Sequence, residues 1–145
     1  MIPLARDPAL DAAYRATRYV VGLPAGEVIV RIGETSAALD RWLAAEGATV
    51  WAWLTADNPG SRRLPEAENA IRRAALDDAL ARAGWRGCRA RAVPDDPAWP
   101  EEHGVLVPGL PRDAACGLAA SFGQLAIVCG RHGAAPELAW IPEFP

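Results

Sequence analysis

The sequence predicts an α+β fold, with a mixed β-sheet and about three main helices in a single domain over residues 1–145. Two features carry this prediction. Short β-rich apolar runs alternate with longer stretches of helical period. The run Thr49–Thr55 is nearly continuous in apolar character, as expected for a central strand covered on both faces. The chain shows no repeat and no linker, and its length suits one hydrophobic core.

The first quarter of the chain predicts a helix followed by a β-hairpin. Asp7 is expected to cap a helix that ends near Tyr14, with Pro8 at its first position. The runs Thr17–Val21 and Val28–Ile32 flank a turn rich in Gly and Pro, so they should pair as antiparallel strands.

The middle of the chain contains the best-supported helix. Ser36 is expected to cap an earlier helix that runs to about Glu46, before the central strand. After the strand, Asp57–Ser61 has strong turn chemistry, and Glu66–Ala83 predicts a long helix rich in Ala and Leu. Asn69, Leu76, Leu80 and Ala83 fall on one stripe of that helix, so an amide is expected to face the core.

The second half predicts four more strands and one more helix. Cys88–Val93 should form a strand that a right-handed crossover joins to the central one in parallel. Pro94–His103 is too rich in proline for regular structure. The remaining predicted elements are strand Val105–Val107, helix Asp113–Phe122 and a closing hairpin of Leu125–Cys129 with Leu138–Ile141. The predicted order is α-β-β-α-β-α-β-β-α-β-β.

Composition excludes several classes of function. The net charge is −3 and all 15 basic residues are Arg, so we expect no binding to nucleic acid. No apolar run approaches a membrane span, no signal peptide is recognisable, and a cytoplasmic location is expected. The three cysteines are odd in number and widely spaced, which indicates free thiols.

Known chemical signatures are absent. The sequence contains no P-loop, Rossmann, nucleophile-elbow or HExxH motif, so no cofactor is expected. Cys129 and His132 have a ligand-like spacing, but one such pair is weak evidence. A buried cysteine near a solvated histidine on a hairpin loop is the preferred explanation, and no metal is expected.

Polar residues near predicted strand ends are the best candidates for a site. Asn58 follows the central strand, Asn69 faces the core from the long helix, and Gln124 enters a later apolar strand. A buried amide is costly unless it is hydrogen-bonded. We therefore expect these three amides to meet at one end of the sheet, either as a structural network or as a ligand site.

Charged and aromatic candidates surround the same region. Glu102 follows Trp99 in the proline-rich loop, and loops often carry functional residues. Arg18 and Arg63 could form a clamp beside Glu102, and Ser61 precedes a helix N-terminus where anions bind readily.

Five short segments carry a resemblance to a known family. They are Tyr14-Arg-Ala-Thr-Arg-Tyr19, Leu54-Thr-Ala-Asp-Asn-Pro-Gly-Ser61, Glu68-Asn69, Trp99-Pro-Glu-Glu102 and Phe122-Gly-Gln-Leu-Ala-Ile127. In this order they resemble a family of small, uncharacterised bacterial proteins with a domain of unknown function. The chain differs from the family pattern at Asp57, where an aromatic residue is common, and at Pro65, where a serine is common. The resemblance implies no reaction.

Two functions from different classes follow. The first is a non-catalytic binding or regulatory module. Its partner would be a small ligand, such as a small anion, or another protein. The second is a hydrolase-like or nuclease-like enzyme that uses Glu102 with an arginine clamp. The first is preferred because catalysis needs a base with an oriented partner. The sequence decides neither the oligomeric state nor whether the protein is an enzyme.

Overall fold

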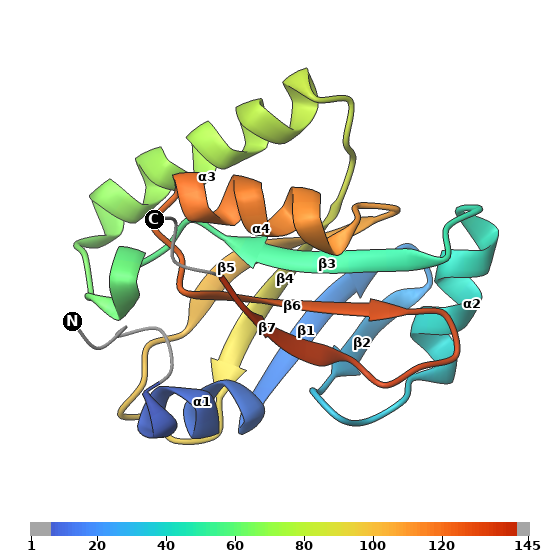
Figure 1. Cartoon of the computed structure of the whole chain (residues 1–145), viewed down its shortest axis with the longest axis horizontal. Helices are drawn as coiled ribbons and strands as arrows, with labels where there is room; N and C mark the ends of the chain where they lie inside the picture. Colours follow the sequence, from blue (N-terminus) through green and yellow to red (C-terminus); the bar gives the residue numbers. More distant parts are fainter. Residues whose placement is uncertain (1–6, 142–145) are drawn as a thin grey trace.

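The computed structural model describes residues 7–141, and these follow the predicted element order (Figure 1). The helices are α1 (Pro8–Arg15), α2 (Ala37–Ala45), α3 (Glu66–Arg82) and α4 (Arg112–Ser121), with a short 3-10 turn, η2 (Pro59–Ser61). The strands are β1 (Thr17–Leu23), β2 (Gly26–Val30), β3 (Val50–Thr55), β4 (Cys88–Pro94), β5 (Glu102–Pro108), β6 (Ala126–Arg131) and β7 (Glu137–Trp140). The α+β class is confirmed.

The seven strands of residues 7–141 form one sheet in the order β2-β1-β4-β5-β3-β6-β7. All six pairings between these strands are antiparallel, so the prediction of a mixed sheet is wrong. The predicted crossover explains the error. β3 and β4 do run parallel to each other, but β5 lies between them and pairs antiparallel with both.

Helices cover both faces of the sheet because the strands alternate their side chains. Along β3, Ala52 and Leu54 pack toward α3 and α4, which lie together on one side in Figure 1. Trp51 and Trp53 point to the opposite face and pack with Leu39 and Leu43 of α2, among others. The strand is buried almost throughout, as its continuous apolar run predicts.

Trp53 spans a neighbouring strand to reach the next one. Its indole Nε1 donates a hydrogen bond to the Ala90 carbonyl of β4, 2.8 Å away, although β5 lies between. Gly104 of β5 makes this possible, because a Cβ there would come within 2.6 Å of the indole. The bond ties β3 to β4 over β5 and fixes the position of the Trp53 ring.

Two local expectations need correction. β5 begins at Glu102 rather than at Val105, because its first residues pair with the end of β4. On α3, Asn69, Leu76 and Leu80 are buried as the helical stripe predicts, but Ala83 lies exposed at the helix end.

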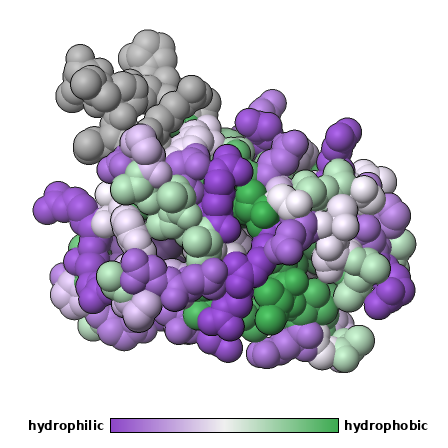
Figure 2. Space-filling model, turned by 90° about the horizontal axis from the view of Figure 1, so that it is seen from below, coloured by the Kyte–Doolittle hydropathy of each residue, from purple (hydrophilic) through white to green (hydrophobic). Residues whose placement is uncertain are grey.

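A helix that spans a membrane is both long and apolar. No helix among residues 7–141 is both long and apolar enough to cross a membrane. Seen from below, the hydrophobic residues form separate patches between hydrophilic ones (Figure 2). Ile29, with 54% of its surface exposed, is one of two large apolar side chains that stand out from the described fold.

Candidate functional site

The turn after β3 is fixed by bonds to its own strand and to β5. The Thr55 hydroxyl donates to the His103 carbonyl at 2.5 Å and accepts from the Asp57 N–H at 3.0 Å. The Asp57 carboxylate in turn accepts from the His103 N–H at 2.9 Å. These bonds bring the start of β5, including Glu102, against the end of β3.

Asn58 and Asn69 form a reciprocal pair inside this turn. The Asn58 N–H donates to Asn69 Oδ1 at 3.0 Å, and Asn69 Nδ2 donates back to Asn58 Oδ1 at 2.9 Å. Asn58 Oδ1 also accepts from the Leu64 N–H, and both amides are buried. Asn58 adopts a left-handed backbone with φ of 49°, which asparagine tolerates better than most residues. The network therefore holds a bent loop between β3 and α3.

The segment after α4 closes the turn from the other side. Gln124 Nε2 donates to the Asp57 carbonyl at 2.9 Å, and the Gly60 N–H donates to the Gly123 carbonyl at 2.8 Å. Arg72 of α3 also donates to carbonyls on both segments. Gly123 has φ of +72°, and a Cβ there would lie 2.8 Å from Pro59 Cβ. The predicted meeting of the three amides, Asn58, Asn69 and Gln124, is confirmed.

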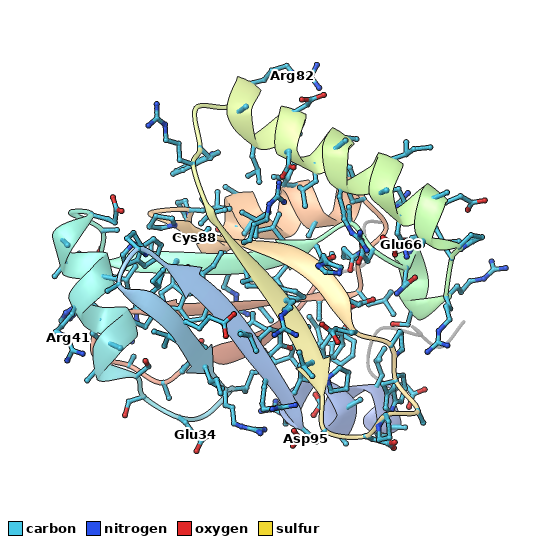
Figure 3. The ribbon with its side chains drawn as sticks, turned by 180° about the vertical axis from the view of Figure 1, so that it is seen from behind. Glu34, Arg41, Glu66, Arg82, Cys88 and Asp95 are labelled. Carbon is cyan, nitrogen blue, oxygen red and sulfur yellow. The ribbon has the colours of Figure 1, made fainter. Side chains whose placement is uncertain are left out.

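A buried ion pair lies behind the turn. Arg73 of α3 donates to both oxygens of the Asp57 carboxylate at 2.8 Å, and the Asp57 side chain is only 1% exposed. Arg73 also pairs with Glu66 at the solvent-exposed start of α3, labelled in Figure 3. A paired, hydrogen-bonded carboxylate in such a position fixes the helix to the turn.

A small cavity of about 50 Å³ opens beside this network, on the sheet face that also carries α2. It is bounded by α1, the ends of β1 and β4, the turn and the loop before β5. Its lining residues are Leu10, Ala13, Tyr14, Thr17, Tyr19, Trp53, Asn58, Ser61, Ala92, Pro94, Trp99, Pro100 and Glu102. At about 10–15 Å³ for each water, the space holds roughly four water molecules, or a group of similar size.

Glu102 is the only carboxylate that lines this cavity among the described residues. Its Oε2 accepts from Asn58 Nδ2 at 3.0 Å, whereas Oε1 accepts no hydrogen bond from residues 7–141. Burial raises the pKa of Glu102 to about 7, with the negative charge of Asp57 adding to the shift and the Asn58 bond opposing it. The carboxyl group therefore changes charge near neutral pH.

Two phenols face the same space. Burial, followed by the negative charge of Glu102, raises the pKa of Tyr14, while the nearby Ser61 hydroxyl acts in the opposite direction. Burial likewise raises the pKa of Tyr19, to which the charges of Tyr14 and Glu102 add. Both phenols are therefore neutral hydroxyl groups at physiological pH.

The Tyr19 hydroxyl is a buried polar group of the cavity that lacks a hydrogen-bond partner within residues 7–141. Tyr19 is 1% exposed, and its Oη has no hydrogen-bond partner within residues 7–141. The ring is held edge-on against Trp53, with 4.8 Å between centroids, so the group cannot easily turn away. A buried hydroxyl without a partner costs free energy, and such a group in a native fold calls for a reason.

The predicted site residues divide into two groups. Asn58, Ser61, Trp99 and Glu102 line the cavity, and Asn69 and Gln124 support it from behind. The two arginines do not join them. Arg18 lies opposite Thr17 and Tyr19 in the strand alternation and pairs with Asp95, which Figure 3 labels near the end of β4. Arg63 is exposed on the loop before α3.

Sequence reasoning missed Tyr14 and Tyr19 as site residues. Both stand in the first segment that carries the family resemblance, yet Tyr19 fits a core strand equally well. It also missed the ion pair of Asp57, whose partner lies sixteen residues further on. The period-two alternation of Thr17 and Tyr19 was the available signal, since it places both side chains on one face.

The described part of the chain contains no cluster of side chains suited to bind a metal ion. Residues 7–141 contain no group of three or more His, Cys, Asp or Glu side chains arranged to hold an ion. Cys88, Cys116 and Cys129 are free thiols, and burial raises the pKa of each, which leaves them poor nucleophiles.

Comparison with known proteins assigns the family. Residues 54–127, from the end of β3 into β6, match the family described as "Protein of unknown function (DUF3293)". The chain belongs to this family. The matched region of the DUF3293 domain contains the turn, both asparagines, Glu102 and Gln124, while Tyr14 and Tyr19 precede it. No curated protein and no solved structure matches the chain.

Proposed function

We propose that this DUF3293 protein is a binding module whose ligand site is the cavity between α1, β1 and the loop before β5. The observation that carries the proposal is the Tyr19 hydroxyl, which is buried and lacks a hydrogen-bond partner within residues 7–141. Tyr19 and Glu102, whose Oε1 accepts no hydrogen bond within residues 7–141, line the same cavity. A ligand that hydrogen-bonds the Tyr19 hydroxyl would offset the cost of burying that group without a partner.

The lining supports small-molecule recognition in a second respect. Most of the cavity wall is apolar or aromatic, and only a few polar groups are held in place by the network behind them. This combination of apolar surface and few oriented polar groups is typical of ligand pockets. The rigid turn would keep Glu102 in position before a ligand arrives, which lowers the entropic cost of binding.

The catalytic alternative, a hydrolase-like or nuclease-like enzyme, draws support from one observation. A carboxyl group with a pKa of about 7 is well matched to general acid–base catalysis. The predicted arginine clamp, however, has no counterpart, because no arginine of residues 7–141 lines the cavity. Without a cation to stabilise developing negative charge, the binding function is the better-supported of the two.

A fragment screen by ligand-observed NMR tests the proposal. Hits are then measured against Tyr19→Phe, which removes one oxygen, and Glu102→Gln, which removes the charge at constant size. Glu101→Gln is the matched control, because Glu101 is exposed and pairs with Arg91 on the surface. Binding that weakens in the two cavity variants and not in the control supports the proposal. Hits that bind all four proteins equally contradict it.

A further inference from the structure

We infer that the cavity recognises a small organic cation that donates N–H hydrogen bonds, with a guanidinium group as the best fit. This inference rests on the proposed function and names its ligand class. Four observations lead to it: the hydrogen-bonding character of the free atoms, the charge of the lining, the aromatic walls and the size of the space.

The free polar atoms call for a donor. Glu102 Oε1 can only accept when the carboxylate is ionised, and Oε2 is already bonded by Asn58 Nδ2 at 3.0 Å. The Tyr19 hydroxyl can accept as well as donate. The Trp53 indole does not compete with a ligand as a donor, because its Nε1 already donates to the Ala90 carbonyl. A ligand with at least two N–H groups therefore satisfies both vacant acceptors.

The charge of the lining selects a cation. Glu102 is the one charged side chain among the described residues of the wall. The Asp57 carboxylate lies behind it, but its charge is already paired with Arg73. No arginine or histidine of residues 7–141 faces the space. The Glu102 carboxylate would repel an anion here, and no arginine or histidine among the described lining residues would offset the repulsion, so the anionic ligand predicted from the sequence is not favoured in this cavity. A cation would instead neutralise the half-buried Glu102 carboxylate.

The aromatic walls favour the same class. Tyr14, Tyr19, Trp53 and Trp99 all line the cavity. Aromatic faces attract cations through the ring quadrupole, and a planar guanidinium can also stack on them. A guanidinium head has four heavy atoms, which suits a cavity of about 50 Å³.

Protonation of Glu102 should then control affinity. The ionisable groups that face its carboxyl are Tyr14 from α1, Tyr19 from β1 and Asp57 from the turn. Both phenols stay neutral, so Glu102 alone changes charge near neutrality. A cation binds the ionised carboxylate, and its affinity should rise with pH through about 7 and level off above it.

Titration of the full chain with methylguanidinium and with N-methylurea, its neutral near-isostere, tests the inference. The readout is the indole N–H resonances of Trp53 and Trp99, with Trp42 on α2 as the remote reference. Methylguanidinium should shift the first two and not the third, with a millimolar Kd at pH 8. Compared with methylguanidinium binding to the wild type at pH 8, we expect an affinity at least tenfold weaker in three cases: at pH 5.5, with N-methylurea as the ligand, and in Glu102→Gln. The control Glu101→Gln should bind methylguanidinium like the wild type.

Other outcomes separate the inference from the function beneath it. N-methylurea binding as tightly as methylguanidinium, with no effect of Glu102→Gln, would overturn the cation and leave a binding module for neutral donors. Tetramethylammonium binding as tightly, unaffected by Tyr19→Phe, would overturn the N–H requirement. No shift by any probe, together with a fragment screen empty of cavity ligands, would overturn both. Comparison with methylammonium and with an acetylated Gly-Arg-Gly amide distinguishes a free cation from an arginine side chain.

Discussion

Asn58 and Asn69 hold each other through two hydrogen bonds, backbone to side chain at 3.0 Å and side chain to side chain at 2.9 Å. The pair joins the end of the central strand to the first turns of α3. Because Asn58 also bonds Glu102, the same pair positions the carboxylate of the cavity. The stability of the turn and the geometry of the candidate site therefore depend on the same few atoms.

Replacing Asn69 with Leu should destabilise the fold. The change leaves the Asn58 N–H without its acceptor in a buried setting, at a cost of about 1–3 kcal/mol. Thermal unfolding followed by circular dichroism should show a clear drop in Tm. Glu68→Leu introduces the same side chain at an exposed neighbouring position and should change Tm little. Equal effects of the two variants would mean that the amide pair is not what stabilises the turn.

Arg73→Gln should cost about 3 kcal/mol, because it strands the Asp57 carboxylate in a buried position. Urea unfolding provides the measurement. The matched control is Arg89→Gln, since Arg89 pairs with Asp77 on the surface, where both side chains are well exposed. That variant should lose less than about 1 kcal/mol. A small loss in both variants would contradict the view that the inner pair holds α3.

Glu102→Gln should alter how stability depends on pH. The pKa of Glu102 in the fold is about 7 against an ordinary value of 4.5, so the native state binds more protons between these two values. The wild-type free energy of unfolding therefore receives a contribution that is present at pH 4.5 and lost as pH rises to about 7. The free energy of unfolding of the wild type, minus that of Glu102→Gln, should therefore be lower at pH 8 than at pH 5 by roughly 2 kcal/mol. Urea unfolding at both pH values measures this difference. The same difference between wild type and Glu102→Gln at pH 5 and pH 8 would falsify the prediction. The control Glu101→Gln should behave like the wild type.

Tyr19→Phe should leave the protein as stable as before, or more stable by up to about 1 kcal/mol. The hydroxyl makes no hydrogen bond within residues 7–141, so its removal takes away a desolvation cost and no bond. The same variant is expected to bind ligand less well, which is the usual trade between stability and function at a binding site. Calorimetric unfolding that shows a loss above about 1 kcal/mol would mean that the hydroxyl has a structural partner.

Gly123→Ala should destabilise the protein, by about 1–3 kcal/mol, through both a left-handed backbone and the approach to Pro59. Gly117→Ala is the contrasting variant. It lies inside α4 with open space around it, so it should stabilise the protein by about 0.5–1 kcal/mol. Chemical denaturation of both variants checks the difference in sign.

Part of the candidate site could be predicted because amides on apolar faces need partners. Helical period alone places Asn69 on the stripe of Leu76 and Leu80, and Gln124 stands before an apolar strand. Each position is costly unless bonded, so their meeting at the turn follows from energetics. The element order follows in the same way from local patterns of period and capping.

The cavity could not be predicted, because it depends on which strands are neighbours. It forms where β1 and β4 meet β5 and β3, and the spatial order of these strands does not follow from the sequence. Tyr19 fits a buried strand as well as a cavity wall, and only its unsatisfied oxygen separates the two roles. The arginine clamp failed for a related reason, since one-residue alternation sends Arg18 to the face opposite Tyr19.

The turn after β3 also has a consequence for the order in which the chain folds. Its hydrogen bonds join residues far apart in sequence, Asn58 to Glu102 and Gly60 to Gly123. These bonds cannot form until β5 and α4 have docked. Contacts of such long range form slowly, because loop-closure entropy must be overcome first. The cavity is therefore expected to be completed late in folding, and the Gly60 amide should exchange its hydrogen with solvent only when the segment after α4 moves away from the turn.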